Sequence, residues 1–303
     1  MKSSRPIRPL AERGGISSTK FGLSRFLDSA RNDTNKFIKP GLILLFGSGE
    51  MSPTGRKIQE HVIKLAKLKA PVRMGILETP TGFEVNAINS WPARMKAFYE
   101  KSLSNFKPQV TMIRAWRKDG AHSTNDPSNA ELIKAQDMIY CGAGSPSYAI
   151  KHLNDSLVWK EMISAHQVGV VLSLGSATAV AVSKYTLPVY EIFKTGQDLF
   201  WLPGLDLFSS YGLNLTIIPH WNNQEGEDFD TSRCWMGVKR FEKLRQMLPT
   251  ETTILGVDEQ TALMVNWVNK EVEIMGLGTV TISKKDTEKI LTSGRKFPLD
   301  TLK

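Results

Sequence analysis

The stretch that decides the fold runs from Val168 to Val182 and reads VGVVLSLGSATAVAV. Its first half is apolar and rich in β-branched residues, which is typical of a buried strand. Gly175 ends this strand, Ser176 follows, and a run of small residues can then begin a helix. A serine at such a turn is typical of a nucleophile elbow, in which the hydroxyl stands clear of the sheet beside backbone N–H groups. Ser176 is therefore the first candidate catalytic residue.

Strands and helices alternate along the chain around this turn. Alternation of this kind favours a three-layer α/β/α sandwich with a mostly parallel sheet covered on both faces. The expected strands of the alternating part cover residues 41–46, 72–77, 110–115, 138–141 and 168–174. The expected helices between them cover residues 58–68, 91–106, 129–135 and 147–153. Four short strands expected to complete one edge of the same sheet cover residues 254–257, 261–267, 272–275 and 279–282.

Composition and charge narrow the range of partners. The formal net charge is +9, and about half of it lies in the first 36 residues, where Lys and Arg outnumber Asp and Glu by eight to three. We therefore expect a basic, flexible tail over residues 1–38, a single α/β domain over residues 39–285 and a C-terminal tail over residues 286–303. The remainder lacks dense basic stripes, so no nucleic-acid partner is expected. No apolar run approaches the roughly 20 residues that span a bilayer, so no membrane partner is expected.

The two cysteines give no sign of a disulfide framework or a metal site. Two cysteines, Cys141 and Cys234, are too few to form a disulfide framework in a chain of 303 residues. Neither belongs to a Cys/His cluster with metal-ligand spacing. The sequence therefore predicts a cytoplasmic protein without a cofactor.

A serine nucleophile needs a base and an acid that orients the base. Among the five histidines, His220 follows an apolar strand at 215–219 and begins a polar, Asn-rich loop, which is a suitable place for a base at a strand end. Glu191, which lies among apolar residues after Ser176, is the preferred acid. Asp198 and Glu225 remain alternatives.

Acyl transfer also needs backbone N–H groups that stabilise a developing oxyanion. Ala177, directly after the candidate nucleophile, is expected to supply one of them. The turn at 142–146 contains Ala143 and Gly144 and permits close approach of its backbone, so it is expected to supply another. Glu225 is a further candidate, because its carboxylate could bind a basic group of the substrate.

Three segments together resemble the cyanophycinase and peptidase E group of serine peptidases. Residues 175–179 (GSATA) resemble the Gly-x-Ser-Ala-Gly-Ala elbow of that group, with Thr178 in place of a glycine. Residues 142–146 (GAGSP) take the place of its Gly-Gly-Gly-Asn loop, and residues 255–263 (LGVDEQTAL) resemble its Gly-Ile-Asp-Glu-x-Thr-Ala-Leu segment. The likeness covers roughly residues 40–283.

This resemblance implies a fold, an activity and the order of a catalytic triad. The fold is the flavodoxin-like fold of class I glutamine amidotransferases. The activity is metal-free hydrolysis of a peptide or isopeptide amide next to an aspartyl residue, through an acyl-enzyme. Ser176, Glu191 and His220 follow the order of nucleophile, acid and base in that group.

Two other functions remain open at this stage. An amidotransferase-like subunit would share the fold, although that chemistry normally uses a cysteine at the elbow. A catalytically inactive binding or regulatory protein would also share it, and Thr178 with the altered 142–146 loop favours this alternative. The expected partner is a small peptide or amide, and the fold is compatible with a homodimer.

Overall fold

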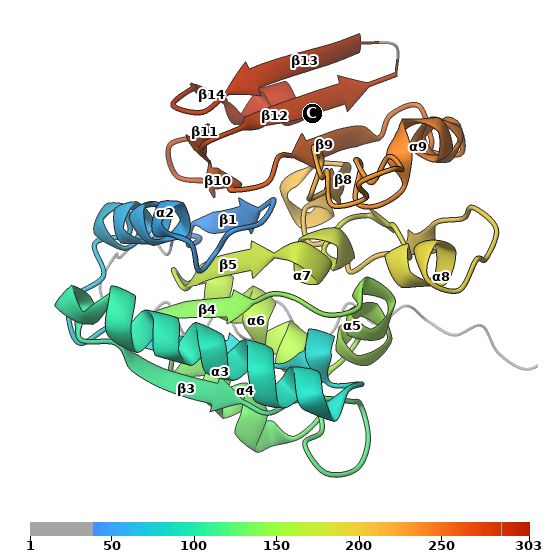
Figure 1. The fold of residues 1–303 in the computed structure, drawn as a ribbon. Coiled ribbons are helices and arrows are strands. Elements are labelled where there is room, and N and C mark those ends of the chain that lie inside the picture. The colour runs from blue at the N-terminus through green and yellow to red at the C-terminus, as the bar shows by residue number, and fades with distance from the viewer. Residues whose placement is uncertain (1–38, 286) are drawn as a thin grey trace, which may run out of the picture. The chain divides into compact units, whose positions relative to one another are not determined.

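A large sheet forms the centre of the protein. The computed structural model describes residues 39–285 and 287–303. Five strands pair in parallel: β1 (Ile43–Phe46), β5 (Val171–Gly175), β4 (Met138–Cys141), β2 (Arg73–Leu77) and β3 (Gln109–Ile113). Three antiparallel strands continue the sheet: β10 (Thr261–Asn266), β11 (Glu271–Gly276) and β14 (Lys296–Pro298). The resulting order is β14-β11-β10-β1-β5-β4-β2-β3 (Figure 1).

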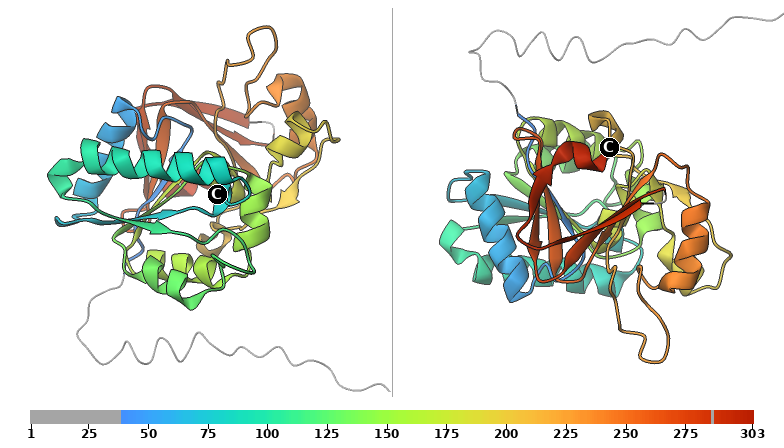
Figure 2. Two further views of the ribbon diagram at one scale, coloured as in Figure 1. Left: turned by 60° about the horizontal axis from the view of Figure 1, so that its bottom comes forward. Right: turned by 90° about the horizontal axis from the view of Figure 1, so that it is seen from above.

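Helices cover both faces of this sheet (Figure 2). The helices α2 (Pro53–Leu65) and α3 (Val85–Ser102) lie on one face, and α4 (Pro127–Lys134) and α6 (Leu157–Gln167) lie on the other. Alternate side chains of β1 point to opposite faces, so Leu44 and Phe46 join the core under α2 and α3, whereas Ile43 and Leu45 join the core under α4 and α6. The predicted three-layer α/β/α sandwich is confirmed.

The C-terminal strands divide between two sheets, which the sequence did not predict. The second sheet has the order β13-β12-β9-β8, with β8 (Leu215–Ile218), β9 (Thr253–Val257), β12 (Thr279–Lys284) and β13 (Thr287–Thr292). The expected single edge is therefore correct only for β10 and β11. A tight turn separates β9 from β10, and Gln260 in this turn has a φ of 52°. That left-handed residue lets consecutive strands enter different sheets.

The expected C-terminal tail over residues 286–303 is wrong. Strand β13 pairs with β12, and β14 pairs with β11 at the edge of the main sheet. Phe297 and Leu302 belong to the core, together with Leu299 in the short η5 helix (Leu299–Leu302). These apolar residues stand singly among polar ones, so they form no periodic pattern. The expected N-terminal tail lies outside the described residues.

The start of α3 differs from the prediction. Helix α3 begins at Val85, earlier than predicted, because the carboxylate of Glu84 caps it by accepting from the N–H groups of Asn86 and Ala87. Within residues 39–285 and 287–303, no helix is long and apolar enough to cross a membrane.

The remaining short elements connect the helices and strands named above. They are η2 (Thr79–Thr81), η3 (Ser104–Phe106), α5 (Pro146–Leu153), α7 (Ser176–Ala181), β6 (Tyr185–Thr186), α8 (Val189–Phe193), β7 (Leu202–Pro203), η4 (Ser209–Tyr211) and α9 (Gly237–Gln246).

Candidate active site

Ser176 lies at a sharp turn between β5 and α7, as the sequence predicted. Strand β5 ends at Gly175, α7 begins at Ser176, and Ser176 has a φ of 46°. A non-glycine residue in the left-handed region is uncommon, and such conformations gather at functional sites. Gly175 has no room for a side chain, because a Cβ there would lie 1.9 Å from Oε1 of Glu50. The turn therefore depends on a glycine before the serine.

His220 is within hydrogen-bond distance of this serine. It follows β8, has a φ of 53°, and its backbone N–H donates to the carbonyl oxygen of Gly47 over 3.1 Å. Its Nε2 lies 3.3 Å from Oγ of Ser176. The ring also packs against the indole of Trp235, with 4.8 Å between the two centroids. The structure thus brings together the candidate nucleophile and the candidate base.

The acid beside His220 is Glu259, a residue that was not among the candidates expected from the sequence. Oε1 of Glu259 lies 3.1 Å from Nδ1 of His220 and also accepts from Nδ2 of Asn223 over 2.9 Å. The backbone N–H of Glu259 donates to Oδ1 of Asn222 over 2.8 Å, which fixes the turn that carries the carboxylate. The hydrogen bond from His220 holds the pKa of Glu259 below its usual value, so the carboxylate is ionised at neutral pH.

The preference for Glu191 as the acid is wrong. Glu191 lies in α8 and accepts a hydrogen bond from the hydroxyl of Ser147 in α5, so it bridges two helices instead of orienting His220. Asp198 is exposed in the loop after α8. Glu225 lines the cleft beside Ser176, but the carboxylate within hydrogen-bond distance of the His220 Nδ1 atom is that of Glu259. Glu259 belongs to the segment 255–263 that carries the sequence resemblance.

The turn at 142–146 approaches Ser176 as expected, and its backbone is held in place by several contacts. Gly144 has a φ of 139°, and a Cβ on it would lie 2.0 Å from the carbonyl oxygen of Pro80. Thr178 is fully buried, and its hydroxyl donates to the carbonyl oxygen of Gly142 over 3.0 Å. The methyl-bearing side chain of Thr178 therefore ties α7 to this turn and does not crowd the cleft.

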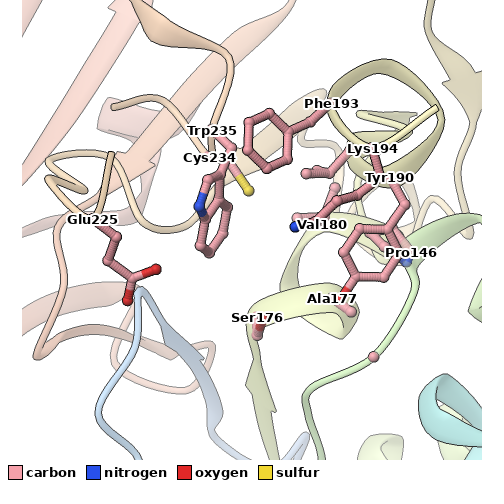
Figure 3. A pocket seen from close by; sticks show the side chains of 12 residues that line it. Pro146, Ser176, Ala177, Val180, Tyr190, Phe193, Lys194, Glu225, Cys234 and Trp235 are labelled. Carbon is pink, nitrogen blue, oxygen red and sulfur yellow. The ribbon is translucent and has the colours of Figure 1, made fainter. Parts of the chain in front are cut away.

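Two adjoining hollows meet at Ser176. The smaller has a volume of about 270 Å³ and includes Ala177 in its wall, whereas the larger has about 580 Å³ and includes Ala143 and His220. Figure 3 shows the smaller hollow, with Ser176 at its base, side chains of α8 on one side and Trp235 and Glu225 on the other. The residues that line both hollows are Gly144, Ser176, Tyr190, Glu225 and Trp235. The four residues expected to bind substrate, Gly144, Ala143, Ala177 and Glu225, thus all lie in the walls beside the serine.

Glu50 is a further carboxyl group at this site. It is half-buried in the turn after β1, lines the larger hollow, and its Oε1 lies 3.4 Å from the hydroxyl of Tyr140. Burial raises the pKa of Glu50, while the nearby His220 opposes the shift. Within the described part of the chain, no group of three or more His, Cys, Asp or Glu side chains is placed to hold a metal ion.

The fold is similar to those of two solved structures. A peptidase from an acI-B1 Actinobacterium is 23% identical and superposes with a TM-score of 0.68, over 86% of this chain and 98% of that chain. A protein described as a peptidase E from Listeria monocytogenes EGD-e is 15% identical, with a TM-score of 0.52 over 79% of this chain and 100% of that chain. No protein-family model and no curated protein matches the sequence. At these identities the likeness establishes the fold, which is the one that the sequence resemblance implied.

Proposed function

We propose that the protein is a serine-type peptidase that cleaves a peptide or isopeptide amide through Ser176, His220 and Glu259. The hydrogen-bond chain from Glu259 to His220 to Ser176 is the observation that supports this most strongly. The names of the two structural neighbours agree with it, since both are described as peptidases.

The first step is attack on the amide carbonyl. His220 Nε2 accepts the proton of the Ser176 hydroxyl as the serine oxygen bonds to the carbonyl carbon. The ionised Glu259 accepts from Nδ1–H, which leaves Nε2 free to act as the base and stabilises the imidazolium that forms. In this proposal, the N–H groups of Ala177 and of the 142–144 turn stabilise the oxyanion.

The second half of the reaction releases both products. The imidazolium gives its proton to the leaving amine, the carbon–nitrogen bond breaks, and an ester to Ser176 remains. Water then attacks this ester with His220 again as the base, and the serine hydroxyl is restored. Each proton that His220 accepts is returned, so the cycle consumes only water and the amide.

Hydrolysis of a set of small amides tests this function. The set includes aspartyl dipeptides and β-aspartyl-arginine, because the sequence resemblance implies cleavage next to an aspartyl residue. It also includes dipeptides of other composition. We expect the wild type to cleave at least one member and Ser176→Ala to lose about a thousand-fold or more in rate. Ser164→Ala in α6 is the matched control and should keep the wild-type rate. Equal rates in wild type and Ser176→Ala would contradict the proposal.

A further inference from the structure

We propose that the smaller hollow holds the side chain on the acyl side of the scissile amide, and that it selects an apolar side chain over a carboxylate. This inference rests on the proposed function and names the substrate class of the same site. It departs from the aspartyl preference that the sequence resemblance implies.

The two hollows differ in which part of the catalytic machinery they contain. His220 lines the larger hollow, so the leaving amine, which must receive a proton from its Nε2, belongs on that side. Ala177 lines the smaller hollow and Gly144 lines both. The carbonyl must lie between the N–H groups of these two residues while bonded to Ser176. The acyl group, and the side chain that it carries, is thereby directed into the smaller hollow.

The deep wall of the smaller hollow is apolar. Val180 and Val189 are 1% and 4% exposed, and they belong to a packed core cluster together with Cys234. Burial raises the pKa of the Cys234 thiol to about 12, so this side chain is uncharged and behaves as a small apolar group. Phe193 continues the wall toward the rim, where its ring stacks on that of Phe229. A substrate side chain that reaches this wall therefore contacts carbon and sulfur atoms.

The charged side chains of the smaller hollow lie at its exposed mouth and are opposite in sign. Lys194 and Glu225 are both exposed, and Lys194 Nζ lies 4.9 Å from the centroid of the Phe193 ring. Figure 3 shows Lys194 with α8 and Glu225 on the opposite loop. A substrate carboxylate in the hollow would lose its water without gaining a buried cation from the described lining residues, which is unfavourable. An apolar side chain avoids this cost and gains burial against the valines.

Amides that share one leaving group test this selectivity. We would measure kcat/KM for the leucyl, alanyl, asparaginyl and aspartyl amides of aminomethylcoumarin. We expect leucyl to exceed aspartyl by about tenfold or more. Asparaginyl, which matches aspartyl in size without its charge, should fall between them.

Two variants locate the preference in the smaller hollow. Val189→Thr keeps the size of the side chain but adds a hydroxyl, so the ratio of leucyl to alanyl cleavage should fall several-fold. Because both rates are measured on one protein sample, a loss of folded protein cancels from this ratio. Lys194→Met removes the cation at the mouth, and leucyl should still exceed aspartyl.

The inference and the proposed function fail in different ways. Preference for the aspartyl amide, lost in Lys194→Met, would overturn the inference and leave a serine peptidase that binds acidic side chains. Reaction of Ser176 with a fluorophosphonate, without cleavage of the leucyl amide, would overturn the inference alone. Absence of both reactions would overturn the proposed function as well.

Discussion

Glu259 and His220 meet because they follow neighbouring parallel strands of the second sheet. Strand β8 pairs in parallel with β9, with Ile218 opposite Gly256. His220 stands two residues after Ile218 and Glu259 three residues after Gly256, so both lie just beyond the carboxyl edge of the strand pair. There, Oε1 of Glu259 is 3.1 Å from Nδ1 of His220. The parallel pairing of β8 with β9 and the turns that follow these strands together bring the acid beside the base.

Replacement of Glu259 tests its role directly. Glu259→Gln removes the negative charge that stabilises the imidazolium, so kcat should fall by about a hundred-fold or more. Glu191→Gln is the matched control, since its carboxylate bonds Ser147 instead of His220, and its kcat should stay within about threefold of wild type. Steady-state kinetics on the best amide substrate measures both. Similar losses in the two variants would contradict the assignment.

The sequence alone could locate the candidate nucleophile and the candidate base but not the carboxylate beside them. Ser176 and His220 both stand directly after apolar strands, and strand ends of this kind are readable from hydrophobic pattern. Glu259 also follows a strand, yet its position beside His220 depends on the pairing of β8 with β9 and on the turns after them, which no local pattern carries. The apolar neighbours of Glu191 favour a specific partner for its carboxylate. That partner is the hydroxyl of Ser147, not His220.

The difference between local sequence pattern and pairing of distant segments also explains which parts of the fold the sequence predicts correctly. The alternating strands and helices between residues 41 and 175 are long and periodic enough to predict the layers of the sandwich. The division of β9 and β10 between two sheets depends on a single turn with a left-handed Gln260. Phe297 and Leu302 fill the core from short elements that have no periodicity, so the sequence suggested a tail there.

The hydrogen bond that the hydroxyl of Thr178 donates to the 142–146 turn beside Ser176 should stabilise the folded protein. Thr178→Val keeps the shape but leaves the carbonyl of Gly142 without the bond that the hydroxyl donates. We expect a loss of about 1–2 kcal/mol in the free energy of unfolding, measured by urea denaturation. Thr178→Ser restores the donor and should recover part of this loss. A valine variant as stable as wild type would show that the bond is unimportant.

Glu50 should make stability fall as the pH rises. Because burial raises its pKa in the folded state, the unfolded chain releases this proton at a lower pH than the folded protein does. Folding therefore becomes less favourable as the pH rises above the ordinary carboxyl pKa of 4.5. Glu50→Gln removes this dependence and should be more stable than wild type by about 1 kcal/mol at pH 8, with a smaller gain at pH 4.5. Glu227→Gln, at an exposed position, should show little gain at either pH. Equal gains at both pH values would contradict this explanation.

His166 should make the protein sensitive to acid. Its ring is fully buried on α6, and burial lowers its pKa to about 4. The unfolded chain therefore binds this proton from about pH 6.5 downward, and stability present at neutral pH is lost progressively toward pH 4, by about 3 kcal/mol in all. His166→Phe should flatten this part of the curve of unfolding free energy against pH. An unchanged slope in the variant would assign the acid sensitivity to other groups.

The most direct test of the account is the reaction of Ser176 with a fluorophosphonate, followed by mass spectrometry of the intact protein and of its peptides. If His220 activates the hydroxyl, the wild type should gain one adduct on Ser176, and His220→Gln should react at least about a hundred-fold more slowly. An unlabelled wild type, or equal labelling rates in the two proteins, would contradict the account.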